Sequence, residues 1–365
     1  MILSQPVALR PASERQLFFW KGLIVKNFVL TAFIGALMFV VVAPLQINAQ
    51  RTRRTPAGSA ARTSLLASLP PSDAVALLNV NRVLDEAMPK LLAENPARLT
   101  EVTNELANFK AQTGLDPRSF GQVALGFRYL FPAEGVTKIS TIALARGTFN
   151  AGAIVAAGRI AADGKYTEEK YQGRTIYRFS LDRQIKLLGL WDINVGELAV
   201  TPLEENLIAL GELDAVRAAI ETNKARKFAN PELVALAERD PNAIVGFGGM
   251  LTPKLMANLR ITNDGIAREL TAVRQVYGTL GMTETDLEVM MAARTVDPDS
   301  AKNLGDTVEG LKQFGALFIN RLSAVKGTLA RSALNNLKIT TQGNELQLRT
   351  AVAQSQVTPL IRGND

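Results

Sequence analysis

The chain of 365 residues contains no cysteine and no histidine. Without cysteine it has no disulfide bond, no thiolate nucleophile and no cysteine that could be lipidated after export. Without histidine it has no Ser-His-Asp triad, no histidine-bound zinc and no imidazole that titrates near neutral pH. These two absences exclude most hydrolase chemistries. Nucleophiles activated by lysine, pairs of carboxylates and all-oxygen metal sites are the catalytic arrangements that remain.

The body of the chain also lacks a surplus of positive charge, although the whole chain has a net charge of +7. Eight of the 41 Lys and Arg residues lie before position 63, together with a single one of the 34 Asp and Glu residues. The remaining positive and negative charges are therefore equal in number. A nucleic-acid-binding protein concentrates its cations on the folded domain. The sequence therefore predicts no nucleic-acid partner.

The N-terminal region has the pattern of an export signal. Residues 28–45 form an 18-residue run without charge, preceded by Lys21 and Lys26. The small residue Ala49 favours cleavage by signal peptidase between Ala49 and Gln50. The run is long for a signal peptide, so an uncleaved membrane anchor is the alternative, in which residues 28–45 make the membrane contact. Both interpretations place the body in the periplasm or cell envelope.

Two further features frame this leader. The 24 residues before Val25 are long for the basic start of a signal peptide, which favours translation from Val25. Residues 50–70 are basic, small and polar, which is typical of a flexible linker. The body is then expected to begin at Pro71.

The body reads as two related halves, residues 71–230 and residues 231–365. Residues 71–84 and 241–254 both run from a turn with Pro and Asp through an apolar strand to a helix start. The two segments are about 170 residues apart, a period that indicates two domain-sized halves and not a solenoid. We predict matching strand-to-helix units in two superposable halves.

Hydrophobic periodicity predicts the elements within each half. The closing hairpin around residues 343–344 alternates apolar and polar side chains, which predicts a sheet with one wet face. Ile266, Leu270 and Val273 predict a helix that Gly278 and Gly281 break. The predicted fold class is α+β: two related halves, each a mostly antiparallel sheet with packed helices, after an N-terminal signal or anchor helix. Other predicted elements are strands at 74–80, 121–129 and 138–146, helices at 96–113 and 150–161, and a hairpin at 196–211.

Three stretches carry a resemblance to a known group of proteins: PPSDAVALLNVN, LEENLIALGELDAVRAAI and KITTQGNELQLRTAVA. In these stretches the chain resembles an uncharacterised family of exported bacterial proteins with a duplicated α/β domain. The resemblance extends over most of residues 70–360 and rests on apolar patterns. It implies a fold and an exported location, and it implies no activity, because the family has none established.

Three short motifs look chemical and lack the residues that their chemistry needs. The run from Gly246 to Gly249 has Leu251 where a dinucleotide-binding loop requires glycine, so we interpret it as a tight strand exit. Ser323 and Lys326 match Ser-x-x-Lys without a downstream Lys-Thr-Gly. Asp297 starts a calcium-like pattern that a helix start explains better. We therefore predict no catalytic, cofactor-binding or metal-binding residues.

One apolar run is a candidate contact surface. Leu187, Leu188, Leu190 and Trp191 lie together within residues 186–193, beside a region with loop character. If they are exposed, they form a patch for a partner or a lipid. The alternative interpretation is that they fill a core.

The sequence leaves three functional hypotheses. The leading one is a non-catalytic exported cell-envelope protein that acts by binding or scaffolding, with an unknown envelope protein or a lipid as partner. The second is a periplasmic carrier that holds a small molecule or lipid in a cleft between the halves. The third is a hydrolase that needs neither histidine nor cysteine. A convergent cluster of carboxylates in a deep pocket would favour the hydrolase. A large dry cavity would favour the carrier, and a flat exposed apolar patch would favour the scaffold.

Overall fold

The structure is a computed structural model that describes residues 64–162, 164–187, 191–225, 230–258, 264–319 and 324–361. The predicted leader, the cleavage position between Ala49 and Gln50 and most of the linker lie outside these residues. No helix in the described ranges combines the length and apolar character needed to cross a membrane.

The fold is α+β, as predicted, and it is built on one large antiparallel sheet. The sheet has twelve strands in the order β11-β12-β10-β9-β8-β1-β2-β3-β7-β6-β5-β4. The strands are β1 (Ala74–Asn79), β2 (Phe120–Ala133), β3 (Val136–Gly147), β4 (Tyr166–Tyr171), β5 (Arg174–Leu187), β6 (Trp191–Glu204), β7 (Leu207–Gly211), β8 (Val245–Met250), β9 (Val273–Met282), β10 (Asp286–Thr295), β11 (Lys338–Gln342) and β12 (Glu345–Ala353).

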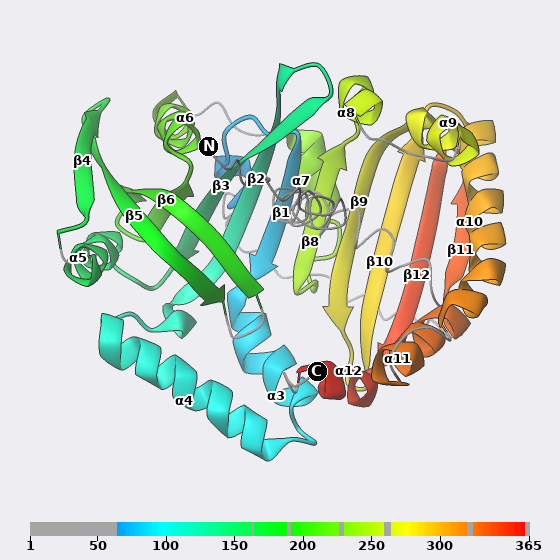
Figure 1. The fold of residues 1–365 in the computed structure, drawn as a ribbon, viewed down its shortest axis with the longest axis horizontal. Coiled ribbons are helices and arrows are strands. Elements are labelled where there is room, and N and C mark those ends of the chain that lie inside the picture. The colour runs from blue at the N-terminus through cyan, green and yellow to red at the C-terminus, as the bar shows by residue number, and fades with distance from the viewer. Residues whose placement is uncertain are drawn as a thin grey trace, which may run out of the picture.

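Helices connect and cover these strands (Figure 1). They are η1 (Leu66–Ser68), η2 (Arg82–Ala87), α3 (Met88–Leu91), α4 (Pro96–Thr113), η3 (Pro117–Ser119), α5 (Ala151–Ala161), α6 (Leu213–Ala225), α7 (Pro231–Ala237), α8 (Pro253–Asn258), α9 (Asp264–Ala272), α10 (Pro298–Ile319), α11 (Ala324–Asn335) and α12 (Gln354–Ile361). Figure 1 shows α10 along the β11 edge of the sheet.

The two predicted halves meet inside this sheet. Strands β1 and β8 pair antiparallel, with Leu77 opposite Gly246. Strands β2 to β7 lie on the β1 side of this pair of strands, and β9 to β12 lie on the β8 side. Both predicted units run from strand to helix, β1 to η2 and β8 to α8, although η2 is a π-helix. The superposition of the two halves stays a prediction.

The sheet has two faces, which we name by their residues in β1. The outer face carries Val75 and Leu77, and the inner face carries Ala76 and Leu78. On the outer face, η1, α6 and α7 pack against the sheet in the main hydrophobic cluster. In Figure 1, α7 lies behind β1 and β8, so the figure looks onto the inner face. On the inner face, α5 packs at one end of the sheet and α10 and α11 pack at the other.

Capping residues explain where the predicted helices begin and end. The side chain of Asn95 accepts a hydrogen bond from the Arg98 backbone at 3.2 Å, and Pro96 occupies the first turn of α4. Gly114 ends α4 at φ 72°, a left-handed conformation that favours glycine. Asn150 caps α5 in the same way, accepting from the Ala153 backbone at 2.9 Å. Both helices were predicted within a residue of these limits.

The glycines of β8 permit the close approach of a helix. A Cβ atom on Gly246 would lie 1.9 Å from the carbonyl oxygen of Ala237, and one on Gly248 would lie 3.0 Å from that of Leu233. Both carbonyls belong to α7. Interpreting this run as a tight strand exit was therefore wrong, because the glycines lie within the strand and make room for α7 on the outer face.

The prediction for residues 273–282 was also wrong. The helix α9 ends at Ala272, and Val273 begins strand β9, which contains both Gly278 and Gly281. Tertiary packing explains the difference, because a Cβ on Gly278 would lie 2.4 Å from the backbone oxygen of Met290 in β10 and 2.8 Å from the ring of Phe247 in β8. Here glycine allows close packing within a sheet and does not break a helix.

Candidate functional site

The inner face has an apolar surface where the two halves meet. Cross-strand pairs place Ala76 beside Leu125 and Phe247, and Leu78 beside Val123 and Val245. We define the junction surface as five half-buried residues of β1, β2 and β8 on this face: Ala76, Leu78, Leu125, Phe127 and Val245.

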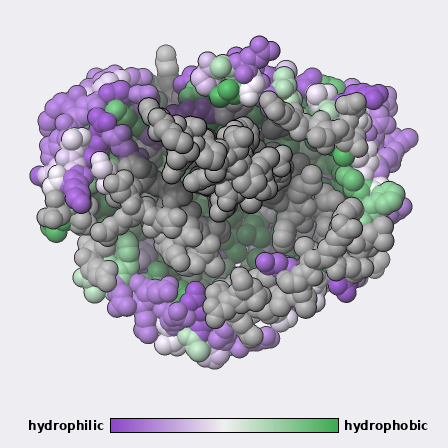
Figure 2. Space-filling model, viewed as in Figure 1, coloured by the Kyte–Doolittle hydropathy of each residue, from purple (hydrophilic) through white to green (hydrophobic). Residues whose placement is uncertain are grey.

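The described helices pack at the two ends of this face, away from the junction surface. Helix α5 packs with Ala145, Val200 and Ile208 at one end, and α10 packs with Val276 and Leu346 at the other. None of these five residues belongs to a hydrophobic cluster of the described residues, whereas their cross-strand neighbours Val123 and Phe247 pack against the clusters on either side. Figure 2 shows hydrophilic residues around much of the rim of this side of the molecule.

The chemistry of the junction surface is limited to apolar contact. Its side chains are those of Ala, Leu, Phe and Val, which neither donate nor accept hydrogen bonds. The backbone groups of its strands are engaged in the sheet. Such a surface can bind an apolar ligand by excluding water, and it offers no group that could act as an acid, a base or a nucleophile.

A second feature is a two-stranded ribbon formed by the paired ends of β5 and β6. We define the ribbon as residues 180–187 of β5 and residues 191–198 of β6, where these strands pair with each other beyond their other neighbours in the sheet. Two residues of the predicted contact patch, Leu187 and Trp191, are paired at its end. The other two, Leu188 and Leu190, lie outside the described residues. The described residues next to this run lie in extended strands, where we expected a region with loop character.

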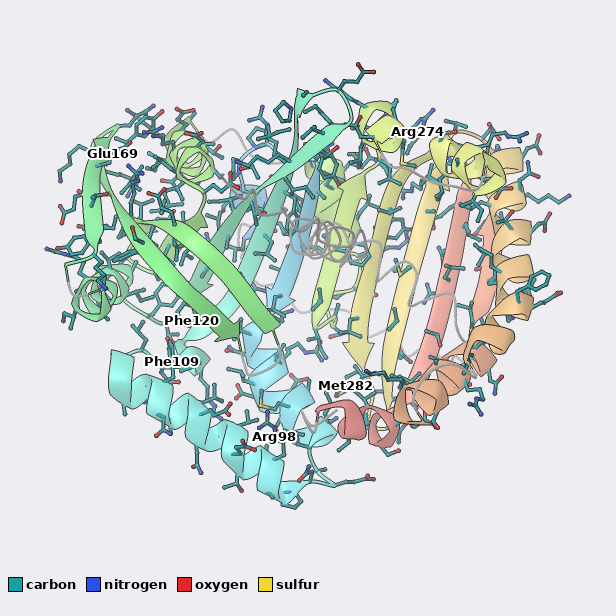
Figure 3. The ribbon with its side chains drawn as sticks, viewed as in Figure 1. Arg98, Phe109, Phe120, Glu169, Arg274 and Met282 are labelled. Atoms are coloured by element: carbon teal, nitrogen blue, oxygen red, sulfur yellow. The ribbon has the colours of Figure 1, made fainter. Side chains whose placement is uncertain are left out.

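The outer face of the second half carries a polar pocket of about 550 Å³. Arg274, at the start of β9, is one of its residues, and Figure 3 labels it together with Met282 at the other end of that strand. The lining residues are polar or charged: Glu232, Arg274, Gln275, Arg294, Thr295, Gln342, Asn344 and Glu345.

Three residues form the centre of this region, and each comes from a different strand. Arg294 of β10 donates from Nε to Glu345 of β12 at 3.0 Å. Tyr277 of β9 is fully buried. The guanidinium carbons of Arg239 and Arg294 lie 5.2 and 5.5 Å from the centre of its ring, which makes two cation–π contacts. Arg239 also donates to the hydroxyl of Tyr277 and pairs with Glu345 at 3.6 Å.

This arrangement shifts two pKa values in opposite directions. Burial, followed by hydrogen bonding to the Glu345 carboxylate, raises the pKa of Tyr277 to about 12. Burial opposes the ionisation of Glu345, but hydrogen bonds from Tyr277, Gln347 and Arg294 outweigh it and lower its pKa. Glu345 is therefore held as a carboxylate and Tyr277 as a neutral hydroxyl.

The polar pocket has the character of a structural clamp. Glu232 of α7 pairs with Arg294 at 3.4 Å, and Arg294 in turn binds Glu345, so α7 is tied to β10 and β12. The carboxylates at the centre are satisfied by arginines, which leaves no free base beside a free nucleophile. No group of three or more acidic side chains in the described part of the chain could hold a metal ion.

The other chemical motifs have structural explanations. Asp297 accepts a hydrogen bond from the Ser300 backbone at 2.7 Å, which caps α10 and lowers the pKa of Asp297. Helix α10 begins at Pro298, which confirms the interpretation of the calcium-like pattern as a helix start. Lys326 of the Ser-x-x-Lys match is exposed on α11, and Ser323 lies outside the described residues.

Comparison with known proteins adds little to this description. No protein-family model matches the chain, and no curated protein matches it. Crystal forms I, III and IV of TP0453 each align with a TM-score of 0.42 and 9% identity. The alignments cover 82 to 83% of this chain and 97 to 99% of those chains. A likeness at this score supports no conclusion about function.

Proposed function

We propose that the protein is a non-catalytic, exported binding protein of the cell envelope that holds an apolar or lipid-like ligand on its junction surface. This combines the binding role that the sequence favoured with the carrier that it left as an alternative. Export is supported by the uncharged run at residues 28–45 and the small residue at Ala49.

One observation carries the proposal: an apolar surface lies where the two halves meet, and helices pack to either side of it. Its residues are half-buried, whereas on the outer face Val75 and Ala124 of the same strands are buried in the main hydrophobic cluster with η1 and α7. A monomeric protein rarely leaves a contiguous apolar surface without use. The position agrees with the cleft between halves that the carrier hypothesis requires.

The alternative of a hydrolase has less support. The acidic and basic residues of the polar pocket bind one another, and the junction surface contains no ionisable side chain. Neither place brings together the acid, base and nucleophile that hydrolysis needs.

The proposal is tested by titrating the protein with a pyrene-labelled fatty acid and following pyrene fluorescence. Saturable binding is expected in the wild type. The double variant Leu78→Gln, Leu125→Gln places polar groups on the surface, and Ala76→Trp fills it while keeping it apolar. Each should weaken binding by about tenfold, because the Gln variant loses apolar contact area and the Trp side chain occupies the space of the ligand.

Ile160→Gln is the matched control. Ile160 lies on α5 with 82% of its surface exposed, so the same loss of an apolar side chain occurs away from the junction surface. This variant should bind the probe like the wild type. Unchanged binding in both junction variants, or the same loss in the control, would overturn the proposal.

A further inference from the structure

A second pocket lies where the two halves approach each other at one end of the sheet. Strand β2 continues past the start of β1 as far as Ala133 and turns back into β3. On the other side of β1, β8 ends and α8 follows. Figure 1 shows the β2–β3 hairpin and α8 side by side at this end. The pocket between them has a volume of about 510 Å³ and is lined by residues of both halves.

This pocket contains two opposite charges that do not pair with each other. Lys254 of α8 and Glu134 of the hairpin both line it. Both are exposed, and neither forms an ion pair with any described residue. The Nζ atom of Lys254 lies 4.8 Å from the centre of the Phe131 ring, which also lines the pocket. This cation–π contact places the ammonium group at the pocket and leaves its charge available to an anion.

The amide group of Asn258 adds an acceptor to the same pocket. Its Nδ2 atom donates to Oγ1 of Thr137 at 3.0 Å, which fixes the orientation of the amide. The amide oxygen accepts no hydrogen bond from a described residue, so it can accept one from a ligand. The pocket therefore offers a cationic donor on α8 and two acceptors, the carboxylate of Glu134 and the amide oxygen of Asn258.

We propose that this pocket binds the zwitterionic head group of a lipid whose acyl chain lies on the junction surface. Lys254 pairs with the phosphate, and Glu134 and Asn258 accept hydrogen bonds from a primary ammonium group. A purely anionic head group would bring its charge beside Glu134 without compensation. The inference rests on the proposed function and names the ligand class, a lipid of the phosphoethanolamine type.

Strand β2 connects the pocket to the junction surface. Tyr129 lies on the same face as Phe127 of the junction surface, and Phe131 follows two residues later. The four residues from Phe127 to Phe131 span about 13 Å of extended strand, so one amphiphilic ligand can occupy both places. Burial, followed by the charge of Asp73, raises the pKa of Tyr129 to about 12. The side chains between the two places are thus uncharged at neutral pH.

The test is isothermal titration calorimetry of the full chain with three lipids that share one short acyl chain. Lysophosphatidylethanolamine carries a phosphate and an amine, lysophosphatidic acid carries the phosphate alone, and a monoacylglycerol carries neither. Each is used below its critical micelle concentration. Lysophosphatidylethanolamine should bind most tightly, by about tenfold over the monoacylglycerol, because its head group makes charge-assisted hydrogen bonds in the pocket.

Two charge-removing variants assign each part of the head group. Lys254→Gln should weaken both phosphate-bearing lipids by about fivefold and leave the monoacylglycerol unchanged. Glu134→Gln should weaken lysophosphatidylethanolamine alone, since only this lipid has an amine. The matched control is Lys302→Gln, which removes the same charge from an exposed position of α10 and should change no affinity. Lipid that binds elsewhere on the chain contributes equally to all variants.

The two proposals fail separately. If the pocket binds no head group, the three lipids bind alike and Lys254→Gln changes nothing, while the junction variants still weaken binding of the pyrene fatty acid. If the junction surface holds no acyl chain, the Leu78→Gln, Leu125→Gln variant keeps every affinity, whereas Lys254→Gln still weakens lysophosphatidylethanolamine. An equal loss for the monoacylglycerol in Lys254→Gln, or the same loss in the Lys302→Gln control, would also overturn the inference.

Discussion

At the scale of single residues, Glu345 is the most constrained charge described in the second half. It has 15% of its side chain exposed and pairs with Arg294 and Arg239, while Gln347 donates to it at 2.5 Å. A carboxylate in this position must be ionised for its neighbours to be satisfied, because removing one partner of a buried pair leaves the other charge uncompensated.

Replacing Glu345 by Gln should destabilise the protein by about 2 kcal/mol, since two arginines then lose their shared carboxylate. Urea unfolding at pH 7, followed by circular dichroism, measures the change. The control is Glu288→Gln, the same substitution on an exposed position of β10, for which the change should stay within about 0.5 kcal/mol. Equal effects would mean that the clamp contributes nothing to stability.

The same carboxylate gives an acidic pH dependence. Its folded pKa lies below the ordinary value of 4.5, so its contribution to stability is present above that value and is lost as the pH falls through the lower folded pKa. The stability difference between wild type and Glu345→Gln should therefore shrink as the pH is lowered below 4.5. Urea titrations across this range check it, and a difference that does not change with pH contradicts the assignment.

Tyr277 makes the stability of the protein depend on pH in the alkaline range. Its folded pKa is about 12 against an ordinary 10, so its contribution is complete below pH 10 and is lost as the pH rises through about 12. The stability difference between wild type and Tyr277→Phe should therefore decrease across this window. Comparing the two proteins cancels the titration of the lysines. A constant difference between pH 10 and 12 would show that the tyrosine hydroxyl is not held neutral by its surroundings.

At the scale of elements, helices with local capping signals were predicted from the sequence, whereas a strand that depends on contacts with other strands was not. The predicted helices around residues 96–113 and 150–161 were confirmed because their caps, Asn95, Gly114 and Asn150, are local signals. Strand β9 was missed because the reason for Gly278 lies in two other strands, in the backbone oxygen of Met290 and the ring of Phe247. No pattern within residues 264–282 contains that information.

Glycines of β8 and β9 provide a graded test of the contact between α7 and β8. Gly246→Ala should destabilise the protein most, Gly248→Ala less and Gly281→Ala least, because their Cβ atoms would meet backbone oxygens at 1.9 Å, at 3.0 Å and nothing within 4 Å. We expect about 3 kcal/mol or more for the first and less than about 1 kcal/mol for the last. The three unfolding free energies give the order. Any other order would place α7 farther from β8 than the structure has it.

The candidate site was accessible from the sequence only in part. The run around Leu187 and Trp191 attracted notice because of its apolar composition, and the pairing of the two strands that contain these residues came from the structure. The junction surface was hidden, because Ala76, Leu125 and Val245 read as ordinary buried-strand residues. Only the strand order shows that helices pack to either side of them.

At the scale of the whole molecule, the two halves share a sheet and a core. The main hydrophobic cluster joins Val75 and Ala124 of the first half to Leu233, Leu236 and Tyr277 of the second. Helix α7 therefore packs across the boundary between the halves, and the β1–β8 pairing continues the sheet through it.

The halves should consequently not fold as separate chains. A fragment of residues 64–230 would lack α7 and expose the edge of β1, which invites aggregation. We expect no cooperative thermal transition for this fragment or for residues 231–365 alone, and one cooperative transition for the intact body. Calorimetry of the three proteins decides this, and cooperative unfolding of either isolated half would show that it is an independent domain.

The most direct test of the account is to photo-crosslink the full chain to a fatty acid that carries a diazirine on its acyl chain and to map the labelled peptides by mass spectrometry. The account predicts labels concentrated on the inner-face residues of β1, β2 and β8, and loss of those labels in Ala76→Trp. Labels on the outer face around Glu345, or labelling that excess unlabelled fatty acid does not displace, would contradict it.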